Sequence, residues 1–133
     1  MSLSKKQLGN IGEEKAYQFL TQQGLKLIEK NFYSRFGEID LIMLESLQPS
    51  IKWNPLTNKE NCLVFVEVRS RKNMGFGSAL ESITISKQQK LRKTANFFLL
   101  KNVKYSKMTA RFDVIIIPPI TSEKQIYWLK NAF

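Results

Sequence analysis

The sequence predicts an α/β protein in which helices pack against a mixed β-sheet, and three observations predict it. The 133 residues fit one domain, which we take as residues 1–133, and suffice to bury a core. Hydrophobic residues make up 43% of the chain and charged residues 24%, as in ordinary globular proteins. Apolar residues recur at helical or alternating spacing in the order helix, three strands, helix, two strands.

The first predicted helix ends before Gly24, since glycine is typical of the position after a helix C-terminus. Its apolar residues recur every three or four positions and are Leu8, Gly12, Ala16, Phe19 and Leu20. Residues 25–32, LKLIEKNF, predict a short strand, and residues 37–44, GEIDLIML, predict a second. Because alternate side chains of a strand share a face, one face of the second strand is expected to carry Ile39, Leu41 and Met43.

Residues 63–71, LVFVEVRSR, predict a third strand, whose apolar face carries Val64, Val66 and Val68. Residues 72–79, KNMGFGSA, predict a glycine-bearing loop after it. The turn-rich segment at about 46–61 joins two strands that we expect to form a hairpin, so it predicts a projecting loop or hairpin tip. Trp53 within it is expected to pack partly against the protein, with stacking on a nucleic-acid base as the alternative.

The second predicted helix covers residues 86–101 and begins at a capping box of Ser86 and Gln89. Its apolar stripe comprises Leu91, Ala95, Phe98 and Leu99. Residues 111–119, RFDVIIIPP, predict a fourth strand that its two prolines end. Residues 125–129, QIYWL, predict a fifth strand.

The composition excludes several kinds of chemistry. Histidine is absent and Cys62 is the one cysteine, so a disulfide framework, a Cys/His zinc site and a histidine general base are excluded. Acid–base or metal chemistry therefore falls to Asp, Glu, Lys, Tyr or water. No apolar run approaches the roughly 18 residues that span a bilayer, and the start, MSLSKKQLGN, lacks a secretory apolar segment. We expect a cytoplasmic protein without a membrane partner.

The net charge of +10 predicts affinity for polyanions, nucleic acid first and anionic membrane second. Residues 69–111 hold 11 of the 21 basic residues and a single acid, Glu81. This one-sidedness favours a surface that follows a phosphate backbone, with a solvated basic face as the alternative. The expected nucleic-acid contacts are Arg71, Lys72, Lys90, Arg92, Lys93 and Arg111.

Acidic residues fall on otherwise apolar strands. Asp40 in the second strand and Glu67 in the third point away from the apolar faces, so they can approach each other if the strands pair. Two partly buried carboxylates repel, and either Mg²⁺ or Arg69, on the same face as Glu67, can compensate. A salt-bridge network without a catalytic role is the alternative. Glu13, at the border of the first helix's apolar face, leans toward the sheet, or else it only complements the helix dipole.

Six short motifs carry a resemblance to a known family. They are GNIGEEKA, NFYSRFGEIDLIM, VFVEVRSR, SKQQKL, RFDVI and WLKNAF. Together they resemble the YraN-like bacterial family, which is similar to the restriction-endonuclease-like superfamily with the motif PD-(D/E)XK. The resemblance covers nearly the whole chain apart from the 46–61 segment. It implies an αβββαβ core with a metal site on the central hairpin, as in Holliday-junction resolvases and many Mg²⁺-dependent nucleases.

The resemblance also implies roles for single residues. The acidic motif position falls on Asp40, the (D/E)XK part begins at Glu67 and ends at Arg69, and the helix-one glutamate falls on Glu13. Lys87 stands where some relatives carry a basic residue. The implied ligands of Mg²⁺ or Mn²⁺ are Asp40, Glu67 and Glu13, and the implied catalytic set adds Arg69 and Lys87. Resolvases usually form homodimers, although we find no dimer signature in this sequence.

The third motif position departs from the family pattern, because it holds Arg69 instead of lysine. Arginine stays protonated and cannot act as a base, but it can hold a phosphate oxygen and stabilise a transition state. The leading hypothesis is a metal-dependent endonuclease that hydrolyses phosphodiesters in nucleic acid, DNA rather than RNA. The alternative is a nucleic-acid-binding module on a nuclease fold that no longer cleaves. An adaptor for acidic partners or membranes is less favoured, since we find no strongly amphipathic lipid-binding helix.

Overall fold

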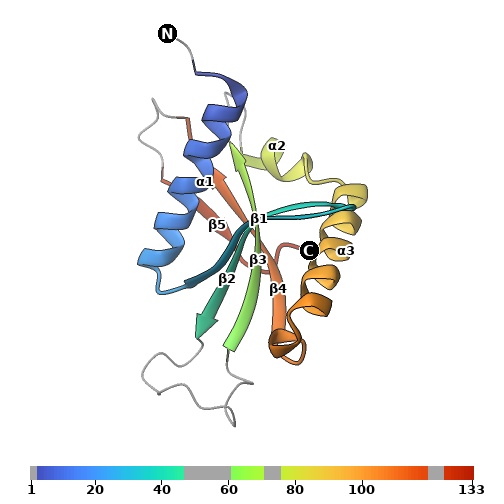
Figure 1. Ribbon diagram of the computed structural model, residues 1–133. Helices are drawn as coiled ribbons and strands as arrows, with labels where there is room; N and C mark the ends of the chain where they lie inside the picture. The colour runs from blue at the N-terminus through green and yellow to red at the C-terminus, as the bar shows by residue number, and fades with distance from the viewer. Residues whose placement is uncertain (1–2, 47–60, 71–75, 120–124) are drawn as a thin grey trace.

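The computed structural model describes residues 3–46, 61–70, 76–119 and 125–133. The chain folds into helices on both faces of one sheet (Figure 1). In chain order the elements are α1 (Lys5–Gln22), β1 (Lys26–Ser34), β2 (Gly37–Ser46), β3 (Asn61–Ser70), α2 (Phe76–Glu81), α3 (Ile85–Lys101), the 3₁₀ helix η2 (Val103–Tyr105), β4 (Thr109–Ile117) and β5 (Tyr127–Leu129). The predicted loop at 46–61 and Trp53 lie almost entirely outside the described residues.

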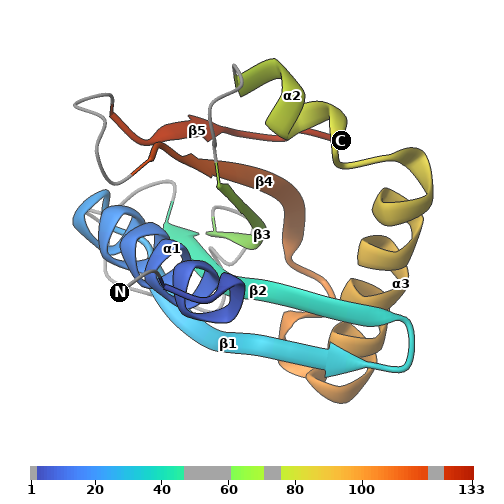
Figure 2. The same cartoon turned by 90° about the horizontal axis from the view of Figure 1, so that it is seen from above.

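The sheet is mixed, with the strand order β1-β2-β3-β4-β5. Neighbouring strands run antiparallel except β3 and β4, which are parallel and joined through α2 and α3. Seen from above, α1 lies on one side of the sheet and α2 and α3 on the other (Figure 2). The predicted α/β class with a mixed sheet and flanking helices is confirmed, and the order of elements is consistent with a restriction-endonuclease-like core.

Each face of the sheet has its own core. Beneath α1, the strands bury small and branched side chains together with Ala16 and Leu20 of the helix. Beneath α3, Phe65 and Phe98 meet edge to face, with ring centroids 6.1 Å apart. The predicted apolar faces of the two helices are largely confirmed, since Ala16, Leu91 and Ala95 are buried, but Leu8 is 42% exposed. The buried faces of α1 and α3 thus fix the position of each helix on the sheet.

Helix boundaries follow local signals, of which some were missed. Gly24 has φ +97, as expected after the end of α1, because glycine has no Cβ to clash in this region. The predicted capping box at Ser86 was wrong: α3 begins one residue earlier, and the Thr84 hydroxyl accepts from the Lys87 backbone N–H at 3.1 Å. The predicted loop at 72–79 was wrong in its second half, where α2 begins at Phe76.

The side-chain alternation of β2 reverses at Asp40. Ile39 packs beneath α3, whereas Leu41 and Met43 pack beneath α1, so the prediction of one shared face was wrong. Asn31 and Asp40 are not paired in the β1–β2 ladder, although the residues on either side of each of them are paired. Asn31 has φ +52, a left-handed conformation that asparagine tolerates better than most residues. This irregularity interrupts the alternation at the residue expected to bind a metal.

None of the helices in the described ranges is long and apolar enough to cross a membrane.

Candidate functional site

The central hairpin forks at the predicted acidic positions. The β2–β3 ladder runs from Ser46–Asn61 to Leu41–Val66 and stops there. Beyond that point β2 continues along β1 and β3 along β4, so the two strands diverge (Figures 1 and 2). Asp40 therefore lies at the fork.

The Asp40 side chain ties the two diverging strands together. Its Oδ2 accepts a hydrogen bond of 2.8 Å from the backbone N–H of Val68 on β3. This hydrogen bond satisfies one backbone donor that the ended ladder leaves without a strand partner. Glu67, the residue before Val68, is 7% exposed and lies in the field of the Asp40 charge. The predicted approach of Asp40 and Glu67 at the hairpin is thus found at the fork.

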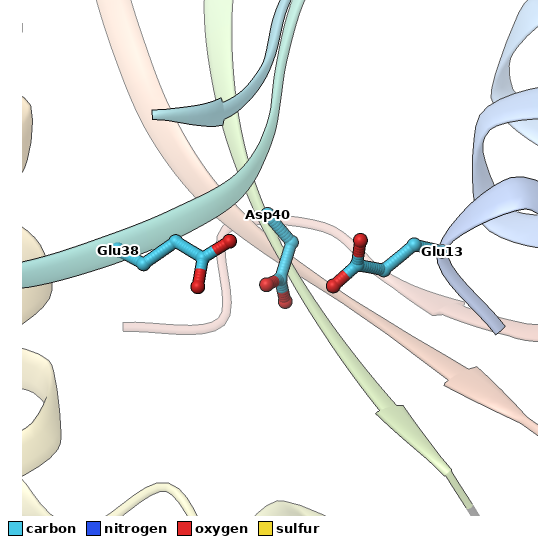
Figure 3. A group of neighbouring side chains, drawn as sticks. All are labelled: Glu13, Glu38 and Asp40. Carbon is cyan, nitrogen blue, oxygen red and sulfur yellow. The ribbon is translucent and has the colours of Figure 1, made fainter. Parts of the chain in front are cut away.

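Three carboxylates converge at this fork. Within the described ranges, oxygens of Glu13, Glu38 and Asp40 lie within 4.8 Å of one another. Figure 3 shows Glu38 and Asp40 reaching from β2 and Glu13 reaching from α1 toward the same point. Glu67 does not belong to this close group. Glu38, which we did not predict as a site residue, does belong to it.

Helix α1 supplies Glu13 because of its position relative to the buried face. Glu13 lies three residues before Ala16 and seven before Leu20, both fully buried, so these side chains share a face of the helix. The next residue, Glu14, is exposed and pairs with Lys30 at 3.1 Å. The prediction that Glu13 rather than Glu14 leans toward the sheet is confirmed.

Asn31 joins the carboxylates from the edge strand. With its side-chain nitrogen turned toward the acids, Asn31 donates to Glu13 Oε2 at 3.0 Å and to Glu38 Oε1 at 2.7 Å. The positive φ of Asn31 goes with the irregular backbone at this point of β1. Asn31 was not predicted, since nothing local in the sequence indicates its conformation. A hollow of about 210 Å³ adjoins the acids on this side, lined by Asn10, Glu13, Glu14, Lys30 and Asn31.

Burial and mutual repulsion raise the pKa values of the acids. Burial and then the Asp40 and Glu38 charges raise the pKa of Glu13 to about 7. Burial and then the Asp40 charge raise the pKa of Glu67 to about 7. Burial also raises the pKa of Asp40, against the hydrogen bond from Val68 and the nearby positive charges, and it raises the pKa of Glu38. Glu13 and Glu67 therefore retain protons up to about neutral pH, and a cation at this site would have to displace them.

These pKa values predict how stability depends on pH. The folded protein holds Glu13 and Glu67 protonated up to about pH 7, whereas both have a pKa of 4.5 when unfolded. Their contribution is fully present below the unfolded value and is lost as the pH rises through the folded value. In chelator, we expect the melting temperature to fall between about pH 5 and pH 8, which calorimetry measures.

Adding Mg²⁺ or Mn²⁺ should raise the melting temperature more at pH 8 than at pH 5, because the ligands must first lose protons. Glu13→Gln should reduce the fall in melting temperature with rising pH. Glu14→Gln, at the neighbouring exposed position, should show the same fall as the wild type. A chelated wild-type protein whose melting temperature does not fall across this pH range would contradict the prediction.

Two cationic side chains face the acids. Arg69 Nη2 lies 3.3 Å from Glu67 Oε1. Its charge partly opposes the effect of burial on the pKa values of Glu67 and Asp40, which remain raised. The Lys87 charge lowers the pKa of the same two acids. Lys87 lies seven residues before Thr94, whose hydroxyl is 3.0 Å from that of Ser34 at the β1–β2 turn, so this face of α3 looks toward the hairpin.

The predicted nucleic-acid contacts separate into three groups. Lys90, Arg92 and Lys93 are exposed on α3. Arg71 and Lys72 lie outside the described residues. Arg111 is bound by two carboxylates, those of Glu45 and Asp113.

Arg111, which was predicted as a nucleic-acid contact, is paired with two carboxylates, and this arrangement indicates a structural role. Its guanidinium lies 2.7 Å from Glu45 Oε1 and 2.9 Å from Asp113 Oδ1, and its side chain is 15% exposed. Burial acts to lower the pKa of Arg111, but the hydrogen bonds to Glu45 and Asp113 raise it above its usual range. These two carboxylates lie at the end of β2 away from the fork. Because the guanidinium is bound to both of them, it is poorly placed to bind a phosphate as well.

The donor set at the fork fits a hard divalent cation. Every candidate ligand is a carboxylate oxygen, and Mg²⁺ and Mn²⁺ prefer oxygen. Oxygens on opposite sides of Mg²⁺ are about 4.2 Å apart, close to the 4.8 Å spread of the three carboxylates. Glu67 Oε2 is buried and has no hydrogen-bond partner in the described parts of the chain, so a further oxygen donor lies in the same fork. A buried polar atom of this kind calls for an explanation, and a cation supplies one.

Fold and site together define an α/β protein whose mixed five-stranded sheet carries an acidic group at its forked central hairpin. Residues 12–117 match the model of a family described as Uncharacterised protein family UPF0102. The chain belongs to this family, and the resemblance to the YraN-like family is confirmed at this level.

Similar proteins share most of this chain. A UPF0102 protein of Colwellia psychrerythraea is 40% identical over 126 residues, which cover 94% of this chain and 87% of the relative. One of Stutzerimonas stutzeri is 39% identical over 125 residues, covering 94% and 92%. One of Legionella pneumophila is 42% identical over 125 residues, covering 94% and 92%. Each of these matches therefore spans nearly the whole of this chain.

Proposed function

We propose that this protein is a metal-dependent endonuclease that holds Mg²⁺ or Mn²⁺ and hydrolyses phosphodiesters of nucleic acid, DNA rather than RNA. The observation that carries the proposal is the convergence of Glu13, Glu38 and Asp40 beside the unpartnered buried oxygen of Glu67. The similarity of the motifs around Asp40 and Glu67 to the PD-(D/E)XK pattern supports it. Glu13, Glu38 and Asp40 are the proposed ligands, with Glu67 as a further ligand at the buried end.

When bound, the cation lowers the pKa of a water molecule and polarises the scissile phosphate. The remaining work belongs to the side chains around it. Arg69, oriented by its ion pair with Glu67, and Lys87 supply positive charge where negative charge develops on the phosphate. Arg69 cannot take a proton from water because it stays protonated.

The exposed basic residues of α3 lie on the helix that also presents Lys87 to the fork. We propose that Lys90, Arg92 and Lys93 contact the phosphate backbone next to the cleaved bond. Arg92 also covers the rings of Phe112 and Phe133, at 5.4 Å and 5.6 Å from their centroids, so part of its role is structural. Lys90 and Lys93 are therefore the clearer residues for a test.

The double variant Lys90→Ala/Lys93→Ala should weaken duplex binding in a salt-dependent way. Each phosphate contact contributes about 0.9 to the slope of log K against log salt, so the slope should decrease in magnitude by about 1.8. Fluorescence anisotropy across a salt series measures it. As a matched control, Lys5→Ala/Lys6→Ala removes two exposed lysines at the start of α1. An equal decrease for both pairs would contradict a specific contact along α3.

A second candidate function is a non-catalytic nucleic-acid-binding module. The ion pair between Arg69 and Glu67 favours it, because the motif's usual lysine is replaced by a residue that cannot act as a base. Both candidates predict binding, and only the first predicts cleavage.

Incubation of the purified protein with supercoiled, linear, branched and single-stranded DNA, and with RNA, separates the two candidates. Each substrate is tested with Mg²⁺, with Mn²⁺ and with chelator. The endonuclease should cut at least one DNA substrate in metal and none in chelator. Binding without cleavage in either metal would favour the module, and the absence of binding to every substrate would contradict both.

A further inference from the structure

Tyr33 presents an exposed aromatic ring at the edge of the acidic site. Its side chain is on β1, and Tyr33 pairs with Glu38 across the β1–β2 ladder. The residue is 68% exposed, whereas its neighbour Phe32 is 8% exposed and packs against Phe98 at a centroid distance of 5.2 Å. An exposed tyrosine beside a buried phenylalanine contributes little to the core, which leaves its ring available for another contact.

The hydroxyl end of Tyr33 is held while its ring is left open. Tyr33 lies opposite Glu38 in the ladder, and the charge of Glu38, then burial and then a side-chain hydrogen bond to Glu38 raise the pKa of Tyr33. The phenol therefore lies beside Glu38, one of the three carboxylates. A ring whose polar end is tied to a proposed ligand has a defined position relative to the reacting phosphate.

Positive charge lies next along the same hairpin. Arg35, two residues further, is exposed, and its guanidinium lies 4.9 Å from the centroid of the Phe36 ring. Lys93 of α3 approaches the same ring at 5.6 Å. The order along the surface is therefore acids, open ring and then cations. This order suits a nucleic-acid strand, in which a base branches from the sugar between two successive phosphates.

We infer that Tyr33 is the stacking platform for an unpaired base of the nucleic acid, next to the phosphate that the acidic site binds. This inference rests on the proposed function, and it names the substrate class as single-stranded nucleic acid or nucleic acid with locally unpaired bases. In a duplex, both faces of each internal base are covered by its neighbours, so no face is free for the ring. Among the strands that the structure describes, β1 is the edge strand, and none of them lies outside it to block a base.

The test is binding of a fluorescein-labelled oligothymidylate of about 12 nucleotides, within the usual site size, and of its duplex with oligodeoxyadenylate. Fluorescence anisotropy is measured in chelator and in Ca²⁺. Tyr33→Leu should weaken single-strand binding by about tenfold, the loss typical of one stacked base, and should change duplex binding by less than about twofold. Tyr33→Phe keeps the ring and should bind the single strand within about twofold of the wild type.

Tyr127→Leu is the matched control, since Tyr127 is a partly exposed tyrosine on the opposite edge strand, β5. It should leave single-strand binding unchanged. A melting temperature of Tyr33→Leu within about 2 °C of the wild type would show that the exposed substitution leaves the fold intact.

A second measurement uses the wild-type protein alone. An oligothymidylate with one internal 2-aminopurine should lose fluorescence on binding, because stacking on an aromatic ring quenches this base. Equal single-strand binding by Tyr33→Leu and the wild type, equal losses for Tyr33→Leu and Tyr33→Phe, or unquenched 2-aminopurine would each overturn the inference. Cleavage that does not depend on Tyr33 would overturn the inference about Tyr33 but leave the proposed endonuclease function standing. Tyr33-dependent binding without cleavage would support it and contradict the endonuclease.

Discussion

Replacing Asp40 with asparagine is expected to lower metal-dependent cleavage of nucleic acid by more than about 100-fold. Loss of an outer partner of a metal ligand typically costs about 10- to 100-fold, and Asp40 is a proposed ligand itself. Asp40 occupies the centre of the site, between Glu38 on the same strand and Glu13 on α1 (Figure 3). No neighbouring carboxylate can take over its place without moving the fork.

The same substitution should make the metal-free protein more stable. Asp40 raises the pKa values of Glu13, Glu38 and Glu67 through its negative charge, so removing that charge relieves repulsion at three neighbours. Asparagine keeps a carbonyl oxygen that can accept from the Val68 N–H. We therefore expect a higher melting temperature in chelator together with the loss of the rise that Mg²⁺ or Mn²⁺ produces. Few substitutions that merely damage a fold would produce this combination.

Calorimetry with and without metal, and a cleavage assay on the same preparations, measure both effects. Glu14→Gln serves as the control, because Glu14 is an exposed neighbour of a proposed ligand. Cleavage by Asp40→Asn at the wild-type rate would show that the activity comes from another site or a contaminant. A melting temperature that still rises with metal would place the cation elsewhere.

The sequence predicted those parts of the site that depend on local spacing. Glu13 could be assigned because its distance from Ala16 and Leu20 places it on the buried side of α1. Asp40 and Glu67 could be assigned because two paired strands bring them to one place. These inferences need only the helical and strand repeats and the pairing of neighbouring strands.

The residues that were missed depend on irregular backbone or distant pairing. Glu38 was missed because its place in the site depends on Asn31, whose left-handed conformation has no local sequence signal. The same irregularity reversed the expected face of Ile39. Arg111 was placed with the basic surface because its partner Glu45 is 66 residues away in the chain. An ion pair between residues so far apart in the chain depends on the order of the strands in the sheet. The spacing of apolar residues in the sequence does not determine that order.

A large loss of stability is expected when Asp113 is replaced with alanine. Asp113 is fully buried and accepts hydrogen bonds from Arg111, from Trp128 Nε1 at 2.9 Å and from the backbone N–H of Asn131 at 2.9 Å. These bonds link β4 to β5 and to the residues after it. Alanine would leave the Arg111 charge with Glu45 alone and would remove the acceptor of the Trp128 and Asn131 N–H groups.

Removing one partner of a buried ion pair costs about 3–5 kcal/mol, so Asp113→Ala should unfold at a temperature lower by about 10 °C or more. Chemical denaturation and calorimetry measure the loss. Glu81→Ala, at an exposed acid of α2, should change stability by less than about 0.5 kcal/mol.

Arg111 provides the complementary measurement. If it is structural, Arg111→Ala should be similarly destabilised, while the salt dependence of nucleic-acid binding by the folded fraction should keep the wild-type slope. A stable Arg111→Ala protein with a reduced slope would restore Arg111 to the nucleic-acid surface. A lower melting temperature with an unchanged slope would show that the two ends of β2 have different roles. The end near Asp113 would stabilise the sheet, and the forked end would hold the proposed active site.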